Sequence, residues 1–158
     1  MKHMTLLHSD LAGRGRQRGL AMVEFAIGAP ILLLLLLAVG EFGRMLSHYN
    51  VLLQSSRDAA RYASHHALNR TIDEIVLSRV EPTTSNLAIY GSPNTASATL
   101  LPGLNASNVQ VSTAGSEHVQ VTIRYVFRPV IGNVLPTFFG KDIPLNVELV
   151  ATSVMRAL

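Results

Sequence analysis

The hydrophobic and polar residues near the start of this chain form a pattern that predicts a membrane helix. No charged residue occurs from Phe25 to Gly40, and every residue from Ile31 to Val39 is apolar. A membrane-spanning helix needs about 20 mostly apolar residues. Residues 20–42 reach that length with Glu24 near one end and Glu41 near the other. A core helix of a soluble protein would keep a polar face, so the unbroken run predicts membrane insertion.

After residue 42 the pattern becomes that of an amphipathic helix. Apolar residues recur at steps of three and four, which is typical of a helix with one buried face. They are Phe42, Met45, Leu46, Tyr49, Leu52, Leu53, Ser56 (the one polar member), Ala59, Ala60 and Ala63. No proline or capping signal separates the two patterns, so we predict one helix from about Leu20 to His66. The change to alanine after residue 56 predicts that a sheet or another helix packs closely there.

The middle of the chain is predicted to hold a second, short helix and a long loop. Thr71 and Glu74 have the spacing of a capping box, so we expect a helix from Thr71 to about Val80, ended by Pro82. Residues 82–108 are rich in Pro, Ser, Thr, Asn and Gly. This composition predicts a surface loop with one short strand near residues 87–90.

The C-terminal part is predicted to form strands. Apolar residues alternate with polar ones in residues 109–113, strictly in residues 119–127 and again in residues 145–153, with a turn at residues 114–116. Three antiparallel strands with one apolar face need a cover, and the alanine-rich stripe of the long helix supplies one. We therefore predict an α+β fold in which the long N-terminal helix packs on a small antiparallel sheet.

The net positive charge lies before the membrane segment. The chain carries a formal charge of +3, and residues 1–19 account for all of it, because Lys2, Arg14, Arg16 and Arg18 stand against Asp10 (four minus one). Arg14, Arg16 and Arg18 precede the span, so the positive-inside rule keeps the N-terminus in the cytoplasm and exports residues from about 44 onward. The remainder is neutral, with nine basic residues (13 minus 4) and nine acidic ones (10 minus 1), which predicts no nucleic-acid partner.

An ordinary secretory signal peptide is the alternative interpretation of the same region. A basic segment, an apolar segment and the small residues Ala38 and Gly40 fit a cleavage site approximately. The mature protein would then begin at Glu41 and be a soluble periplasmic binding domain. Against this, the basic segment is long, Glu24 stands where such peptides are apolar, and the helical pattern continues through the cut.

Several motifs between residues 18 and 64 occur in combination. They are Arg18-Gly19, Val23-Glu24-Phe25-Ala26, Pro30 with the leucine run, Glu41-Phe42-Gly43-Arg44 and Ala59-Ala60-Arg61-Tyr62-Ala63. In this combination the chain resembles the TadE-like family, the pseudopilins or minor pilins of tight-adherence (Tad, type IVc) pilus systems. The C-terminal half resembles the family only in its general pattern.

The resemblance implies a pilin-like layout and a role in assembling a Tad (Flp-type) pilus. It implies that a membrane prepilin peptidase removes a basic cytoplasmic leader, residues 1–19, by cutting between Gly19 and Leu20. The long helix, residues 20–67, would then hold a membrane segment at about 20–42, and residues 68–158 would form an extracytoplasmic α+β domain. Further implied partners are other pilins or pseudopilins, the Tad inner-membrane assembly platform and membrane lipid. The implied location is the bacterial inner membrane, crossed once, with incorporation in the pilus left open.

The resemblance also assigns roles to Glu24 and Phe25. After the cut Glu24 is the fifth residue, and Phe25 stands where many pilins carry an aromatic side chain. The cut creates an α-amino group with a pKa of about 7.7–8.0, which is largely cationic at neutral pH. We expect Glu24 to pair with such an amine, its own or a neighbour's, and so to set the register of assembly. In the alternative, Glu24 is only interfacial and is stabilised by the helix dipole.

The sequence shows no catalytic constellation. Cysteine is absent, so there is no thiol nucleophile and no disulfide framework. There is no phosphate-binding glycine loop and no Gly-x-Ser-x-Gly motif. His65 and His66 are adjacent, so on a helix they point about 100° apart and do not form a metal-binding pair. We expect a protein that is not an enzyme and needs no cofactor or metal.

Overall fold

The computed structural model describes residues 12–69, 71, 74–130, 134–135, 143–144 and 146–158. It comprises two compact units, residues 1–40 and residues 41–158, of which the second is called the C-terminal unit. The main elements are α1 (Ala12–His66), α2 (Glu81–Tyr90), β3 (Val109–Thr113), β4 (His118–Phe127) and β7 (Val147–Arg156). Shorter elements are β1 (Leu68–Asn69), β2 (Glu74–Ile75), η1 (Leu77–Arg79), η2 (Ala106–Asn108), β5 (Val134–Leu135) and β6 (Ile143–Pro144).

Helix α1 is continuous and ends at His66, as the periodicity predicts, although it begins at Ala12 rather than near Leu20. Pro30 lies inside the helix without ending it. Among the described residues, one helix is long and apolar enough to cross a membrane, with a mean hydropathy of 2.5 and none of its apolar window buried. Leu20, Leu36 and Val39 are each at least 70% exposed. This exposure is consistent with a single membrane anchor.

The C-terminal unit contains a three-stranded sheet in the order β3-β4-β7. Both pairings are antiparallel, and β4 is paired with β7 along its whole length, from His118 opposite Arg156 to Phe127 opposite Val147. The turn between β3 and β4 contains Gly115 at a φ of 77°, a left-handed conformation that glycine adopts without a steric penalty. The strands therefore form as the alternating pattern predicts.

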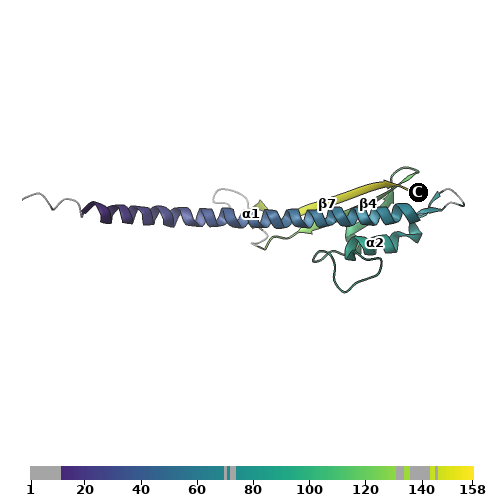
Figure 1. Ribbon diagram of the computed structural model, residues 1–158, viewed down its shortest axis with the longest axis horizontal. Coiled ribbons are helices and arrows are strands. Elements are labelled where there is room, and N and C mark those ends of the chain that lie inside the picture. The colour runs from purple at the N-terminus through teal and green to yellow at the C-terminus, as the bar shows by residue number, and fades with distance from the viewer. Residues whose placement is uncertain (1–11, 70, 72–73, 131–133, 136–142, 145) are drawn as a thin grey trace, which may run out of the picture. The chain divides into compact units, whose positions relative to one another are not determined.

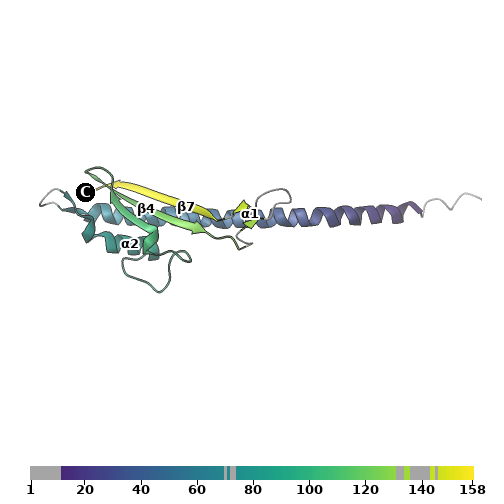
Figure 2. The same ribbon diagram turned by 180° about the vertical axis from the view of Figure 1, so that it is seen from behind.

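The apolar face of the sheet packs on the small residues of α1. Val121 and Ile123 of β4 belong to one buried cluster with Leu52, Ala59 and Ala60 of α1. The alanines let this part of the helix approach the sheet closely, so the cluster packs without voids there. In Figures 1 and 2 strand β7 and helix α2 lie on either side of the C-terminal part of α1. The predicted α+β, pilin-like layout is confirmed.

A hydroxyl pair accounts for the polar position in the helical stripe. Ser56 is fully buried, and its Oγ lies 2.9 Å from Oγ of Ser153 on β7 and 3.0 Å from the carbonyl oxygen of Leu53. A buried hydroxyl is tolerated when it is hydrogen-bonded. At the far end of β7 the N–H of Leu158 donates to the carbonyl of Ser64 at 2.9 Å, which ties the end of the chain to the last turns of α1.

The prediction of a helix from Thr71 to Val80 is wrong for the described residues. Residues 74–75 form β2, which pairs with β1, and a 3-10 turn at residues 77–79 follows. Pro82 lies in the first turn of α2 and does not end a helix. Proline is favoured in that position because its missing N–H would have no partner there. Pro82 therefore marks the start of α2 and not, as predicted, the end of an earlier helix.

The predicted surface loop of residues 82–108 is correspondingly shorter. Residues 81–90 are helical, so the strand expected near residues 87–90 is absent from this described stretch. Gly91 ends α2 in the left-handed conformation at a φ of 68°. Leu101 and Leu104 are buried in the main cluster and anchor the following segment, and the exposed loop lies between Gly91 and these leucines. Leu145, the predicted start of the last strand, lies outside the described residues.

The close approach of α1 to the sheet makes Ala60 sensitive to added volume. Ala60 is fully buried, so Ala60→Leu should lower the free energy of unfolding by about 1–3 kcal/mol through overpacking. Gln54→Leu, at an exposed position of the same helix, is the control and should change it by less than about 0.5 kcal/mol. Urea unfolding of the full chain in detergent, followed by tyrosine fluorescence, measures both. Equal effects of the two variants would contradict the packing of α1 on the sheet.

Candidate functional site

The predicted processing and orientation residues lie on the first turns of α1. Gly19 and Leu20 are helical and exposed. Arg14, Arg16 and Arg18 also have helical backbone, and their side chains lie outside the described part. In a regular helix the carbonyl of Gly19 accepts a bond from the amide four residues later, so the peptide bond after Gly19 lies within the hydrogen-bonded helix. Residues 12–19 include three glycines, and each weakens a helix by about 1 kcal/mol relative to alanine.

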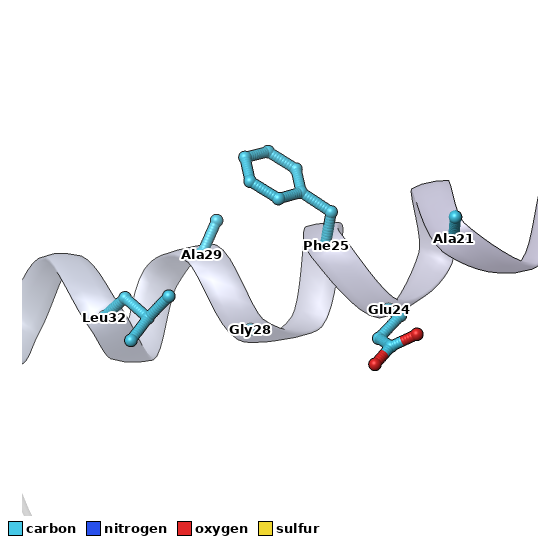
Figure 3. Close-up of a pocket in the computed structure, with 6 residues that line it drawn as sticks. All are labelled: Ala21, Glu24, Phe25, Gly28, Ala29 and Leu32. Carbon is cyan, nitrogen blue, oxygen red and sulfur yellow. The ribbon is translucent and has the colours of Figure 1, made fainter.

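Glu24 lies beside a shallow groove on the surface of α1. The groove is lined by Ala21, Glu24, Phe25, Gly28, Ala29 and Leu32, and Figure 3 shows its residues. In that view the side chains of Glu24 and Phe25 point to opposite sides of the helix. Gly28 follows Glu24 by one turn, and a Cβ added there would meet nothing within 4 Å. The helix therefore leaves open space next to the carboxylate.

The carboxylate of Glu24 has no partner in the described structure. It is exposed, and it forms no hydrogen bond or ion pair with any described residue. It is also the one charged residue in residues 20–40. Phe25, next to it, is 73% exposed. Such a site can accept hydrogen bonds or a cation, and its surroundings offer only apolar contacts.

The C-terminal unit has a second charged site, which we call the Glu41–Arg44 clamp. Nη2 of Arg44 lies 2.8 Å from Oε2 of Glu41 and donates to the carbonyl of Arg128, also at 2.8 Å. Oε1 of Glu41 accepts a bond from the amide of Val130 at 2.9 Å. The guanidinium of Arg44 lies 4.7 Å from the ring centre of Phe127. These contacts fasten the segment after β4 to the first turns of α1 in this unit.

His48 and Tyr125 extend the clamp into the core. The His48 ring meets the rings of Tyr125 and Phe127 edge-on, at centroid distances of 5.8 and 5.4 Å. Its Nδ1 is buried without a hydrogen-bond partner among the described residues. Burial lowers the pKa of His48 below its ordinary value, and Arg44 lowers it further, against the opposing effect of Glu41. Burial also raises the pKa of Tyr125, whose hydroxyl donates to the carbonyl of Pro102 at 3.1 Å.

Sequence reasoning missed this clamp. Opposite charges at Glu41 and Arg44, three residues apart at the end of an apolar run, were the available signal. Their further partners are the backbone groups of Arg128 and Val130, which no side-chain pattern reveals. The sequence places Glu41 near one end of the predicted membrane segment, and the structure gives its side chain defined partners in the C-terminal unit.

Comparison with known families bears on both sites. The family model described as TadE-like protein matches residues 19–61. Residues 19–61 form a TadE-like domain. The domain begins at Gly19 and includes Glu24, Glu41 and Arg44. It relates the chain to the Tad pilus system and to a pilin-related family that is generally non-enzymatic. No curated protein and no solved structure matches the chain.

The TadE-like domain thus includes the helical half of the clamp but not the strand half. Arg128 and Val130 lie beyond its end at residue 61. The helical half also supplies Leu52, Ala59 and Ala60, which cover the sheet. The matched residues therefore form the supporting surface on which the C-terminal strands pack.

Loss of the clamp should destabilise the C-terminal unit. Glu41→Ala leaves the amide of Val130 and the guanidinium of Arg44 without this partner, so the free energy of unfolding should fall by about 1–3 kcal/mol. Glu148→Ala is the control, because its carboxylate lies 3.8 Å from Arg124 and both side chains are more than half exposed. An exposed pair of this kind contributes about 0–1 kcal/mol. If urea unfolding shows no greater loss for Glu41→Ala than for Glu148→Ala, the clamp is not a stabilising contact.

The lowered pKa of His48 predicts a specific acid sensitivity. His48 binds a proton more readily in the unfolded chain than in the folded one. The free energy of unfolding should therefore fall as the pH drops below 6.5, the ordinary pKa of histidine. His48→Phe should reduce the loss measured between about pH 7.5 and pH 5.5, whereas His118→Phe, at an exposed position, should not. An unchanged loss in His48→Phe would show that acid acts through other groups.

Proposed function

We propose that this protein is a membrane-anchored pseudopilin or minor pilin that takes part in Tad pilus assembly. The observation that carries the proposal is one exposed, apolar stretch of helix with a single charged residue, Glu24, inside a domain that begins at Gly19. An acid in such a stretch is costly in lipid, and an acid that is retained there generally has a function. The membrane supplies the apolar surroundings, and assembly supplies the partner.

Cleavage after Gly19 provides the partner for Glu24. The cut releases residues 1–19 and leaves Leu20 with a cationic α-amino group. At 1.5 Å per residue this amine lies about 6 Å along the helix axis from Glu24 of the same chain. A neighbouring subunit, displaced along the fibre, can place its own amine against the same carboxylate. In an apolar environment an unpaired member of such a pair is strongly disfavoured, so the pairing sets the register between subunits.

The remaining assignments follow from this arrangement. The peptidase acts on the glycine-rich start of α1, and Arg14, Arg16 and Arg18 hold the leader in the cytoplasm. Residues 20–42 anchor the chain once in the bacterial inner membrane. The α+β domain, with the end of the long helix that supports its sheet, then lies outside the cytoplasm. Other pilins, the Tad assembly platform and membrane lipid are the partners, and Phe25 adds an exposed aromatic contact next to Glu24.

A soluble binding domain released by a signal peptidase is the second candidate. The division of the structure after Gly40 favours it, because residues 41–158 keep the buried clusters and the clamp. The match of the TadE-like domain across that point favours the first candidate.

The mature N-terminus separates the two candidates. Mass spectrometry of protein recovered from the native membrane should show a chain that begins at Leu20, because the peptidase cuts after Gly19. Gly19→Leu should prevent cleavage and leave the leader attached. The control Gly28→Leu, which alters a glycine away from the cleavage site, should be cleaved normally. A mature chain beginning at Glu41 would establish the signal-peptide candidate instead.

Replacement of Glu24 separates processing from assembly. Glu24→Gln keeps the shape of the side chain and removes its charge, so cleavage should proceed while incorporation of the subunit falls by roughly tenfold or more. Glu24→Asp, which keeps the charge on a shorter stem, should retain part of the wild-type level. Immunoblots of sheared pili and of membranes measure both steps. If the cleaved Glu24→Gln protein is incorporated into pili at the normal level, Glu24 has no role in assembly and is only an interfacial residue.

A further inference from the structure

One end of the C-terminal unit exposes apolar side chains at several neighbouring positions. Phe42 is 61% exposed, Val130 79% and Val147 43%. The bond from the amide of Val130 to Glu41 places Val130 beside the first turn of the unit, and Val147 pairs with Phe127, the last residue of β4. Helix α1, the segment after β4 and the start of β7 therefore contribute to one surface at this end.

The same end carries positive charge. Arg128 is exposed, and its backbone carbonyl accepts a bond from Nη2 of Arg44, so Arg44 lies beside the backbone of Arg128. The carboxylate of Glu41 is engaged by Arg44 and by the amide of Val130. Glu148, near the start of β7, faces Arg124 at 3.8 Å. Among the described residues, no acidic side chain forms an ion pair with Arg128.

We propose that this end, defined by Phe42, Val130, Val147 and Arg128, docks on the headgroup layer of a phospholipid bilayer. The inference rests on the proposed function, because it takes residues 20–42 as the membrane segment. Glu41 directly follows the apolar run that ends at Gly40, so this end of the unit is the one that emerges at the lipid surface. Aromatic and long basic side chains suit that layer, and anionic headgroups attract arginine.

Docking gives the exposed residues a partner that the described residues of the unit do not supply. The valines and Phe42 enter the boundary between headgroups and acyl chains, and Arg128 meets the lipid phosphates. The clamp fixes the backbone of Arg128 and Val130 relative to the first turns of α1 in this unit, so these two residues are positioned before the surface meets lipid. A subunit that leaves the membrane for a fibre must give up these contacts together with those of its membrane segment.

Tryptophan substitution tests this directly, because the chain contains no tryptophan. Val130→Trp, Val147→Trp, Leu34→Trp and Val154→Trp are each made in the full chain and reconstituted in vesicles of equal parts phosphatidylethanolamine and phosphatidylglycerol. Lipids brominated near the headgroup end of the acyl chains quench nearby indoles. We expect quenching at residues 34, 130 and 147. Val154 is 50% exposed but pairs with Gln120, toward the other end of the sheet, so no quenching is expected there.

The outcomes distinguish docking from anchoring. Quenching of Leu34→Trp without quenching at 130 and 147 overturns the docking and leaves the proposed function standing. A blue-shifted but unquenched tryptophan at 130 also overturns it, since protein and not lipid then covers the surface. Unquenched Leu34→Trp overturns the membrane anchor and the docking with it.

The charge contribution has its own control. In the Val130→Trp background, Arg128→Glu should reduce quenching by vesicles that contain phosphatidylglycerol, and Arg79→Glu, an exposed basic residue of η1, should not. Equal unfolding midpoints in urea verify that each variant is folded. An equal reduction by both variants would show a general charge effect and would overturn the role of Arg128.

Discussion

Helix α1 is one continuous helix whose first part is suited to lipid and whose second part packs on a sheet, and the rest of the structure depends on this division. From Leu20 to Val39 its large side chains, apart from Glu24, are apolar and exposed, which suits lipid and no aqueous environment. In the C-terminal unit the same helix presents Leu52, Ala59 and Ala60 to the sheet. Without this cover the apolar face of the three-stranded sheet would be open to water, and such a sheet is not stable alone. The helix is therefore both the proposed anchor and the main support of the α+β domain.

Glu41 and Arg44 lie at the point on α1 where the exposed apolar stretch ends and the part that packs on the sheet begins. Charged residues at the end of a membrane helix are usually regarded as simple boundary markers. Here Arg44 donates to the carbonyl of Arg128 and lies over the ring of Phe127, and Glu41 accepts a bond from the amide of Val130. The clamp thus fixes the first turns of the unit to the end of β4, while Leu158 and Ser64 bond at the other end. Between the two ends, the sheet is held along the helix by apolar packing and by the Ser56–Ser153 hydroxyl pair.

The elements that follow from periodicity were predictable, and those that depend on local context were not. The end of α1 at His66 and strands β3, β4 and β7 follow from apolar residues spaced at three to four or at two. Pro82 and Thr71 were misread, because proline both ends and begins helices and because a capping-box pattern does not ensure a helix. The position of Glu24 as the one charged residue in an apolar stretch could be read from the sequence. The clamp could not, because half of it is main chain from a segment distant in sequence.

The proposed assembly depends on the carboxylate of Glu24, whose proposed partner is an α-amino group made by proteolysis. The most direct measurement is zero-length cross-linking of native membranes and pili with a membrane-permeant carbodiimide, followed by mass spectrometry. The account predicts an amide bond between the side chain of Glu24 and the α-amino group of a processed N-terminus. Mixed isotope-labelled and unlabelled copies would show whether this bond joins two chains. If the processed protein forms cross-links through other carboxylates but none between Glu24 and an α-amino group, the pairing does not exist and the assembly mechanism is wrong.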